Sequence, residues 1–312
     1  MLNKRLLFVT GKGGVGKTTV AAAVAVLAAR KGLRTLLCEV DGKGELSGVL
    51  GSSAVSYKER EMASGLFAMS MDTEAALREY LRIYMHIPVV GRIGPLAKAF
   101  DFVATAAPGV KEILIVGKLC YEVRERTYDL VVVDATATGH VVAHLAAPQV
   151  LAELVKVGLI ESQTKWMVGM LSDPQVTGLV IVATPEEMPV TETIELVERV
   201  ENETSVNLTS VVVNRVLPEL FARSEEEQFD ILCSDKGVKA FTDAAGAGSS
   251  ALLDGARMAV NLRRSSTLHM ERLRDALPGD VPVLNVPYCF DPGSAPDLVD
   301  QVAASLSEEL GL

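Results

Sequence analysis

The chain reads Leu6-Leu7-Phe8-Val9-Thr10-Gly11-Lys12-Gly13-Gly14-Val15-Gly16-Lys17-Thr18-Thr19 near its beginning. Leu6 to Thr10 is a short apolar run typical of a buried strand, and Thr18 to Lys31 has the pattern of a helix. The segment between them matches G-x-x-x-x-G-K-[ST], in the strand–loop–helix context that this phosphate-binding loop requires. Its glycines let backbone N–H groups converge on phosphates, and the helix N-terminus adds partial positive charge. The sequence therefore predicts a nucleotide site formed by Gly11, Lys12, Gly13, Gly14, Val15, Gly16, Lys17, Thr18 and Thr19.

Two lysines of this loop have predicted chemical roles. Lys17 is expected to neutralise the β- and γ-phosphate oxygens of ATP, while the hydroxyl of Thr18 binds Mg²⁺. Lys12 adds a second lysine, which marks the deviant Walker A pattern K-G-G-x-G-K-T. In ATPases with this pattern the first lysine reaches the phosphates of a neighbouring subunit, so Lys12 and Lys17 are both predicted to be catalytic. The simpler alternative is that Lys12 is an exposed loop lysine.

Further apolar runs follow along the chain, separated by helical stretches. Several are apolar on both faces, as in Val131-Val132-Val133, which is typical of strands covered by helices on both sides. The order of elements predicts the α/β class, with a doubly wound, mostly parallel sheet of the P-loop NTPase type and an inserted helical subdomain. The later predicted strands are Thr35 to Val40, Leu66 to Met71, Leu130 to Asp134, Leu179 to Ala183, Ser210 to Asn214 and Val283 to Val286.

The predicted domain organisation is simple, because no internal repeat or long linker divides the chain. Residues 1–312 are expected to form a single ATPase domain. Residues 72–127 and 149–172 are helical in pattern and too long for simple crossovers, so they are predicted to be insertions that form a subdomain. Residues 217–279 are a further helical segment before the last strand, interrupted by small residues from Ala244 to Ser250.

Composition and net charge argue against several kinds of binding partner. Of the 312 residues, 49% are apolar and 22% charged, which suits a compact globular core. The formal net charge of −10 argues against nucleic acid as a partner. The longest apolar run, Val20 to Ala29, is too short to cross a bilayer, so we expect a cytoplasmic location without stable membrane insertion. The four cysteines are scattered without a C-x-x-C pair, and neither zinc nor an iron–sulfur cluster is predicted.

Two further segments resemble motifs of one known family. After the second predicted strand the chain reads Asp41-Gly42-Lys43-Gly44-Glu45-Leu46-Ser47, and after the strand at Leu130 it reads Asp134-Ala135-Thr136-Ala137-Thr138-Gly139-His140. These resemble switch I (D-P-A-H-N-L-S) and switch II (D-T-A-P-T-G-H) of the arsenite-pump type of anion-transporting ATPase and of the ATPase that targets tail-anchored proteins. Three shorter segments follow the family's order and spacing, namely Asp173 to Thr177, Thr184 to Glu187 and Val213 to Arg215. The helical stretch Arg92 to Lys118 is similar to the helical subdomain of the family's bacterial members.

The resemblance implies roles for particular residues. Asp41 would orient or activate the attacking water, and Asp134 would hold the Mg²⁺ shell together with Thr18. Asn214 would read the adenine edge, since its amide both donates and accepts, and Pro287 would close over the base. Switch II would consist of Asp134, Thr138, Gly139 and His140, where His140 is either a conformational reporter or a structural histidine.

Departures from the family pattern limit the implied function. Gly42-Lys43-Gly44 replaces Pro-Ala-His after Asp41, which predicts a more mobile loop, and Ala137 replaces the usual proline of switch II. The zinc motif of the eukaryotic targeting factors is absent, because Cys233 is the only cysteine between Asn214 and the last strand. The cysteine triad that binds arsenite has no match either, so metalloid transport is disfavoured.

These observations predict a Mg²⁺-dependent ATPase that closes as a dimer on ATP and opens after hydrolysis, as a homodimer or as a heterodimer with a related ATPase. The helical subdomain would handle a hydrophobic client or partner protein. Six methionines and one tryptophan lie in or near this subdomain, and the flexible methionine side chains suit a groove that adapts to different clients. Ordinary core packing is the alternative for each residue. The residues are Met62, Met69, Met71, Met85, Trp166, Met167 and Met170.

Other functions remain as alternatives. The first is a slow ATP-dependent switch or scaffold of the septum-site or partition type, although those proteins usually add a basic membrane-binding tail or a DNA-binding surface. An arsenite-pump ATPase subunit is disfavoured by the cysteine pattern. A nitrogenase-reductase-like electron carrier would need a cysteine soon after switch II, and none lies between Asp134 and Cys233.

Overall fold

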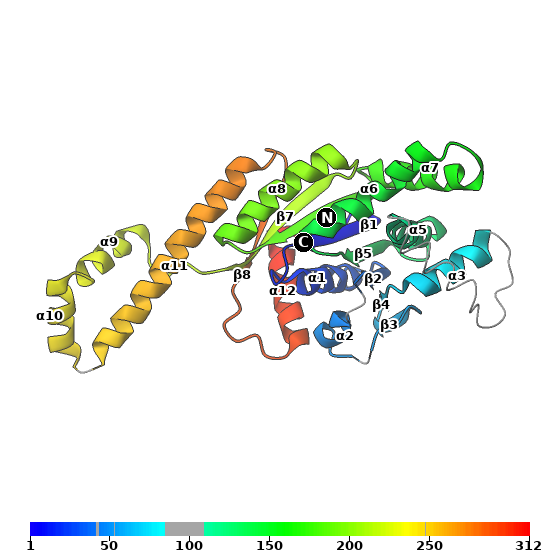
Figure 1. Ribbon diagram of the computed structural model, residues 1–312. Helices are drawn as coiled ribbons and strands as arrows, with labels where there is room; N and C mark the ends of the chain where they lie inside the picture. The colour runs from blue at the N-terminus through cyan, green and yellow to red at the C-terminus, as the bar shows by residue number, and fades with distance from the viewer. Residues whose placement is uncertain (42–43, 53, 85–108, 247) are drawn as a thin grey trace.

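The computed structural model describes residues 1–41, 44–52, 54–84, 109–246 and 248–312. Within these residues the chain folds around an eight-stranded sheet with the strand order β3-β4-β2-β5-β1-β6-β7-β8 (Figure 1). Only the edge pair β3 and β4 is antiparallel, so the predicted doubly wound, mostly parallel sheet is confirmed. The strands are β1 (Leu6–Gly11), β2 (Thr35–Glu39), β3 (Arg60–Ala63), β4 (Leu66–Ser70), β5 (Leu130–Asp134), β6 (Thr177–Ala183), β7 (Leu208–Val216) and β8 (Val283–Pro287).

Helices cover both faces of the sheet (Figure 1). One face packs against α1 (Lys17–Arg30), α2 (Glu45–Val49) and α12 (Ala295–Glu309). The other packs against α3 (Thr73–Tyr84), α5 (Val110–Glu125), α6 (Thr138–Leu154), α7 (Gly158–Ser172), α8 (Glu187–Glu203) and the end of α11 (Ser249–Ala276). The described part also contains α9 (Arg223–Leu232) and α10 (Asp235–Ala245).

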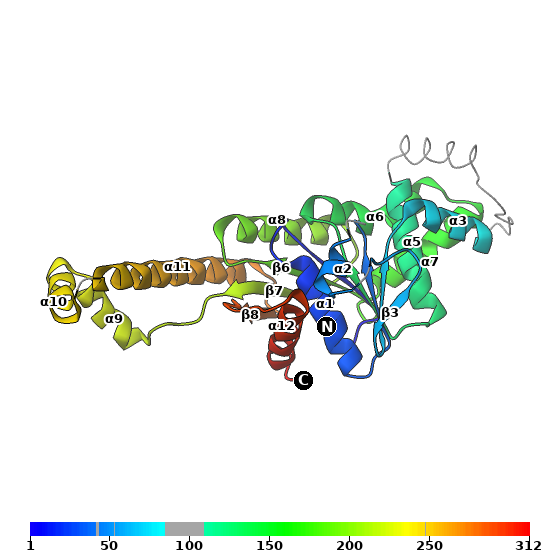
Figure 2. The same ribbon diagram turned by 90° about the horizontal axis from the view of Figure 1, so that it is seen from below.

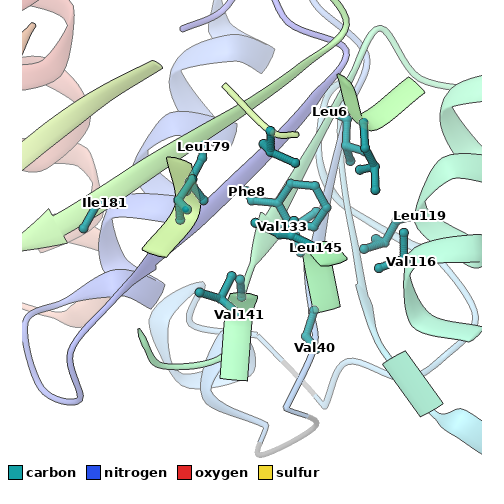
Figure 3. Packing of buried hydrophobic residues seen from close by; sticks show 14 of the residues in the cluster. Leu6, Phe8, Val40, Val116, Leu119, Val133, Val141, Leu145, Leu179 and Ile181 are labelled. Carbon is teal, nitrogen blue, oxygen red and sulfur yellow. The ribbon is translucent and has the colours of Figure 1, made fainter. Parts of the chain in front are cut away.

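The central strands are buried on both faces, as their continuous apolar sequences predict. Leu6 and Phe8 of β1 point into the core beneath α5 and α6, and Figure 3 shows Phe8 beside Val133 and Leu145. Leu7 and Val9 alternate to the opposite face and pack against α1. Each such side chain contributes roughly 1.5–3 kcal/mol by leaving water. Because β1, β2 and β5 are adjacent and parallel, the residues after their carboxyl ends meet at one edge of the sheet.

The structure differs from the sequence-based expectation at two places. The strand β3 was not predicted, because Arg60 and Glu61 are exposed edge residues without apolar alternation. The predicted insertion 149–172 begins inside a longer helix, since α6 starts at Thr138 in switch II and continues to Leu154 before α7 begins. The last residues of switch II and the first part of the predicted insertion 149–172 therefore belong to one helix, α6.

The segment 217–279 forms an arm that extends away from the sheet (Figure 2). The long helix α11 runs along it, and α9 and α10 pack on its outer part through a small apolar cluster that contains Phe229, Leu253 and Val260. The predicted interruption near Ala244 to Ser250 corresponds to the break between α10 and α11. No helix among the described residues is long and apolar enough to cross a bilayer.

Candidate functional site

The loop between β1 and α1 depends on glycine at two tight positions. Gly11 has a φ of +150°, and a Cβ atom there would lie 2.1 Å from the carbonyl oxygen of Val182 in β6. Gly16 has a φ of +95°, and its Cβ would lie 2.5 Å from Nδ2 of Asn214. Gly13 has no heavy atom within 4 Å of the corresponding position. The loop therefore packs closely on β6 and β7 through Gly11 and Gly16, whereas Gly13 is exposed.

We expect Gly11→Ala to lower the free energy of unfolding by about 2–4 kcal/mol, because the added methyl group meets backbone rather than a flexible side chain. Gly13→Ala is the matched control in the same loop and should change this free energy by less than about 0.5 kcal/mol. Urea titration followed by circular dichroism measures both variants. Equal transition midpoints would contradict the close approach of Gly11 to Val182.

Both lysines of the loop have partners within the chain. Lys17, the first residue of α1, donates from Nζ to the carbonyl oxygen of Lys12 at 3.2 Å. Lys12 reaches α8, where its Nζ lies 2.5 Å from Oε1 of Glu192. The side chains of this ion pair are 30% and 29% exposed, so the pair is accessible from solvent. Lys17 thus bonds within the phosphate loop, while the ammonium of Lys12 is paired with a carboxylate of its own chain.

Asp134 ends β5 beside the start of α1 and has the properties of a cation ligand. It is buried, and its Oδ1 has no hydrogen-bond partner among the described residues. Burial raises the pKa of Asp134 to about 7, opposed by a hydrogen bond from Thr18 and the charge of Lys17. A buried carboxylate oxygen without a partner is costly unless a cation or a proton satisfies it. Asp134 and the hydroxyl of Thr18 therefore fit the oxygen-ligand preference of Mg²⁺.

Glu39 is a site residue that the sequence analysis did not single out. It is the last residue of β2, it is 2% exposed, and it pairs in register with Asp134 of β5. Its carboxylate accepts the N–H of Glu45 at 2.8 Å, the N–H of Gly44 at 3.2 Å and the hydroxyl of Ser70 at 2.9 Å. An acidic residue inside the otherwise apolar run Thr35 to Val40 was the available signal. Glu39 therefore holds the backbone at the start of α2, Gly44 and Glu45, against the sheet.

Asn214 and Pro287 lie at the ends of β7 and β8. The side-chain amide of Asn214 is buried and donates to the carbonyl oxygen of Val15 at 2.8 Å, while its Oδ1 accepts the N–H of Arg215 at 2.9 Å. In this structure Asn214 therefore supports the phosphate loop. Pro287 is exposed and lines a cavity of about 540 Å³ between the sheet edge and α11. Their predicted contacts with adenine remain predictions.

The remaining predicted residues lie at the same carboxyl edge. Asp41 follows β2 and is exposed; Gly42 and Lys43, where a mobile loop is predicted, lie outside the described residues. Switch II is tied to β1, because the hydroxyl of Thr10 donates to the carbonyl oxygen of Thr136 at 2.8 Å. The switch II residues after Asp134 form the start of α6, and they are Thr138, Gly139 and the exposed His140.

A cavity of about 970 Å³ lies among α3, α5, α6 and α7. Its walls are mainly apolar and include Leu77, Val150, Leu151 and Trp166. One wall contains the buried ammonium of Lys118, which lies 2.6 Å from the carboxylate of Glu122 and 2.9 Å from that of Glu79. The cavity is thus apolar with one internally paired charge cluster.

The side chains considered for an adaptable groove have different environments. Trp166 and Met167 line the cavity. The core under α5 and α6 contains Met69 and Met71, with Met170 packed against it, whereas Met62 packs on the opposite face. Met85 lies outside the described residues. Ordinary core packing accounts for the methionines near the sheet.

Comparison with known proteins gives consistent matches. The family described as anion-transporting ATPase matches residues 4–170 and 160–231. The ATPase BagA of Mycobacterium tuberculosis is 34% identical over 225 residues, which cover 69% of this chain and 66% of that protein, slightly less than two thirds of its length. A putative arsenical pump-driving ATPase 2 of Aquifex aeolicus is 28% identical over 260 residues, covering 72% of this chain and 86% of the relative. The ATPase get3 of Neurospora crassa is 31% identical over 163 residues, covering 51% of this chain and 48% of the relative.

Proposed function

Because this chain belongs to the anion-transporting ATPase family, we propose that it hydrolyses ATP with Mg²⁺ and that the hydrolysing form is a dimer. The observation that carries this proposal is the arrangement of the phosphate loop. Lys17 lies at the start of α1, the unpartnered Oδ1 of Asp134 lies beside Thr18, and a second lysine, Lys12, stands on the loop. This combination supplies the charges that phosphoryl transfer needs.

Different residues of the site have different roles in the proposed reaction. Backbone N–H groups of the loop and the ammonium of Lys17 bind the β- and γ-phosphates, and Thr18 and Asp134 would hold Mg²⁺, which supplies positive charge to the phosphate oxygens when bound. The carboxylate of Asp41 would accept a hydrogen bond from a water and aim its oxygen at the γ-phosphorus. The water oxygen bonds to the γ-phosphorus as the bond from that phosphorus to the bridging oxygen breaks, a proton of the water passes to the released phosphate, and ADP and phosphate result.

The proposed dimer gives Lys12 its role. In this arrangement the side chain of Lys12 extends across the dimer interface to the phosphates bound by the neighbouring subunit. Its ammonium group there stabilises the charge that develops in the transition state. Steady-state turnover per protomer, measured across a wide range of protein concentration, tests this. Specific activity that rises and saturates supports a homodimer. Flat, near-zero activity with intact ATP binding contradicts it and favours a related ATPase as the second subunit, or the slow switch of the septum-site or partition type.

The ion pair between Lys12 and Glu192 bears on this dimer, because Lys12 must leave Glu192 to reach a neighbour. We expect Glu192→Gln to lower the dissociation constant of the ATP-bound dimer by about two- to thirtyfold, since a partly exposed pair is worth about 0.2–1 kcal/mol and a symmetric dimer breaks two. Sedimentation velocity with a non-hydrolysable ATP analogue measures this constant. Glu195→Gln, one turn along α8 at an exposed position, is the matched control. A weaker dimer in Glu192→Gln would mean that Glu192 acts in the closed dimer instead.

The cavity among α3, α5, α6 and α7 supports a coupled hydrophobic client. The first turn of α6 is switch II, and its last turns place Val150, Leu151 and Leu154 at the cavity wall. Val150 and Leu154 are 53% and 76% exposed, and because they adjoin the apolar cavity wall they extend its apolar surface toward a partner. The helix α6, which contains Pro148, joins the two places, so a movement of switch II would change the cavity. We propose an apolar segment of a client protein as the occupant.

A further inference from the structure

Two carboxylates converge on the single hydroxyl of Thr18. Its Oγ1 donates to Oε2 of Glu45 at 3.1 Å, and Asp134 lies close enough for the same hydroxyl to lower the pKa of its carboxyl group. A hydroxyl has one proton, so it cannot donate to both carboxylates at once. Oδ1 of Asp134, on a side chain that is more than nine-tenths buried, has no hydrogen-bond partner among the described residues. The group therefore presents more acceptor oxygens than donors, and this is the arrangement that a divalent cation satisfies.

The position of Glu45 is fixed by its backbone. Its N–H is held by the buried carboxylate of Glu39 at 2.8 Å, and the N–H of Gly44 by the same carboxylate at 3.2 Å. Glu39 is in turn oriented by the hydroxyl of Ser70. Gly44 has a φ of +75°, a left-handed conformation that turns the chain into α2 directly before Glu45. These bonds place Glu45 beside the phosphate loop, where its carboxylate accepts the hydrogen bond of Thr18.

Glu45 is also a departure of this chain from the switch I pattern D-P-A-H-N-L-S, which has asparagine at that place. An amide oxygen is neutral, whereas a carboxylate adds a full negative charge close to Asp134. Two carboxylates at close range repel each other unless a proton or a cation lies with them, and a divalent cation offsets both charges at once.

We propose that Glu45 is a further carboxylate of the divalent-cation site, which it forms with Thr18 and Asp134, and that it gives this site affinity for the cation before ATP binds. The inference rests on the proposed Mg²⁺-dependent function, which it makes more specific. The carboxylate of Glu45 binds the cation directly or through one water.

The test measures cation binding in the absence of nucleotide, with the full chain. Free Mn²⁺ is quantified by electron paramagnetic resonance during titration of wild type, Glu45→Asn and Glu45→Gln. We expect both variants to bind Mn²⁺ about tenfold more weakly or worse, as is usual when a group that orients or holds a metal is lost. Glu227→Gln, an exposed residue of α9, is the control for the loss of one negative charge and should bind as wild type does. Asp134→Asn should also lose affinity.

Equal Mn²⁺ affinity of wild type, Glu45→Asn and Glu45→Gln would overturn the inference. Thermal unfolding checks that both variants fold, and the isosteric glutamine keeps the test valid if asparagine alone disturbs α2. A fluorescent ATP analogue measures nucleotide binding separately. A wild type that fails to bind this analogue would contradict the proposed ATPase, whereas a change in Mn²⁺ affinity on replacing Glu45 would still support the cation site.

Discussion

Lys17→Ala is expected to weaken ATP binding by at least about a hundredfold. The ammonium of Lys17 lies at the start of α1, where the helix N-terminus and the loop N–H groups already favour phosphate. A charge pair near a protein surface is worth up to about 4 kcal/mol at 4 Å, and each 1.4 kcal/mol is a factor of ten in affinity. Anisotropy of a fluorescent ATP analogue measures the dissociation constant directly.

Lys31→Ala is the matched control for this prediction. Lys31 is the exposed C-cap residue of the same helix, so its removal takes away one positive charge at the end remote from the phosphate loop. Its ATP affinity should stay within about twofold of wild type, because the effect of a surface charge is screened over such a distance. Comparable losses in Lys17→Ala and Lys31→Ala would mean that net charge, rather than the position of Lys17, governs binding.

The predictable part of the fold is the part that local sequence determines. The strands β1, β5 and β6 are buried on both faces, so almost all of their residues are apolar. Such a continuous apolar run can be recognised in the sequence alone. The phosphate loop is predictable for a different reason, since Gly11 and Gly16 adopt backbone conformations at close approaches that only glycine tolerates. β3 leaves no such signal, because its edge position needs no apolar face.

The unpredicted part of the site depends on contacts between distant residues. Lys12 and Glu192 are 180 positions apart, and nothing near Glu192 distinguishes it from the other acidic residues of α8. Glu39 acquires its role only when β2 pairs with β5 and brings its carboxylate between Asp134 and the backbone of Glu45. The residue types were visible in the sequence, but their partners follow from the strand order.

Lys12→Ala is expected to keep ATP affinity within about threefold of wild type and to lower turnover by about a thousandfold, the range found when a cation supplied by a neighbouring protein to phosphoryl transfer is removed. The reason is that Lys12 points away from its own loop toward Glu192, so its own nucleotide site does not depend on it. Single-turnover hydrolysis of ATP together with analogue binding separates the two effects. Equal losses in binding and turnover would contradict a role in a neighbouring subunit.

Mixing Lys12→Ala with Lys17→Ala makes the strongest form of this test. A mixed dimer contains one complete site, because the Lys12→Ala chain binds ATP and the Lys17→Ala chain supplies an intact Lys12. Half of the dimers in an equal mixture are mixed, so the activity should recover to roughly a quarter of the wild-type rate if the sites act independently. Each variant alone should stay inactive. A mixture that forms dimers yet remains inactive would count against donation of Lys12 across the interface, because a lysine that acts within its own chain gives no mixed dimer a complete site.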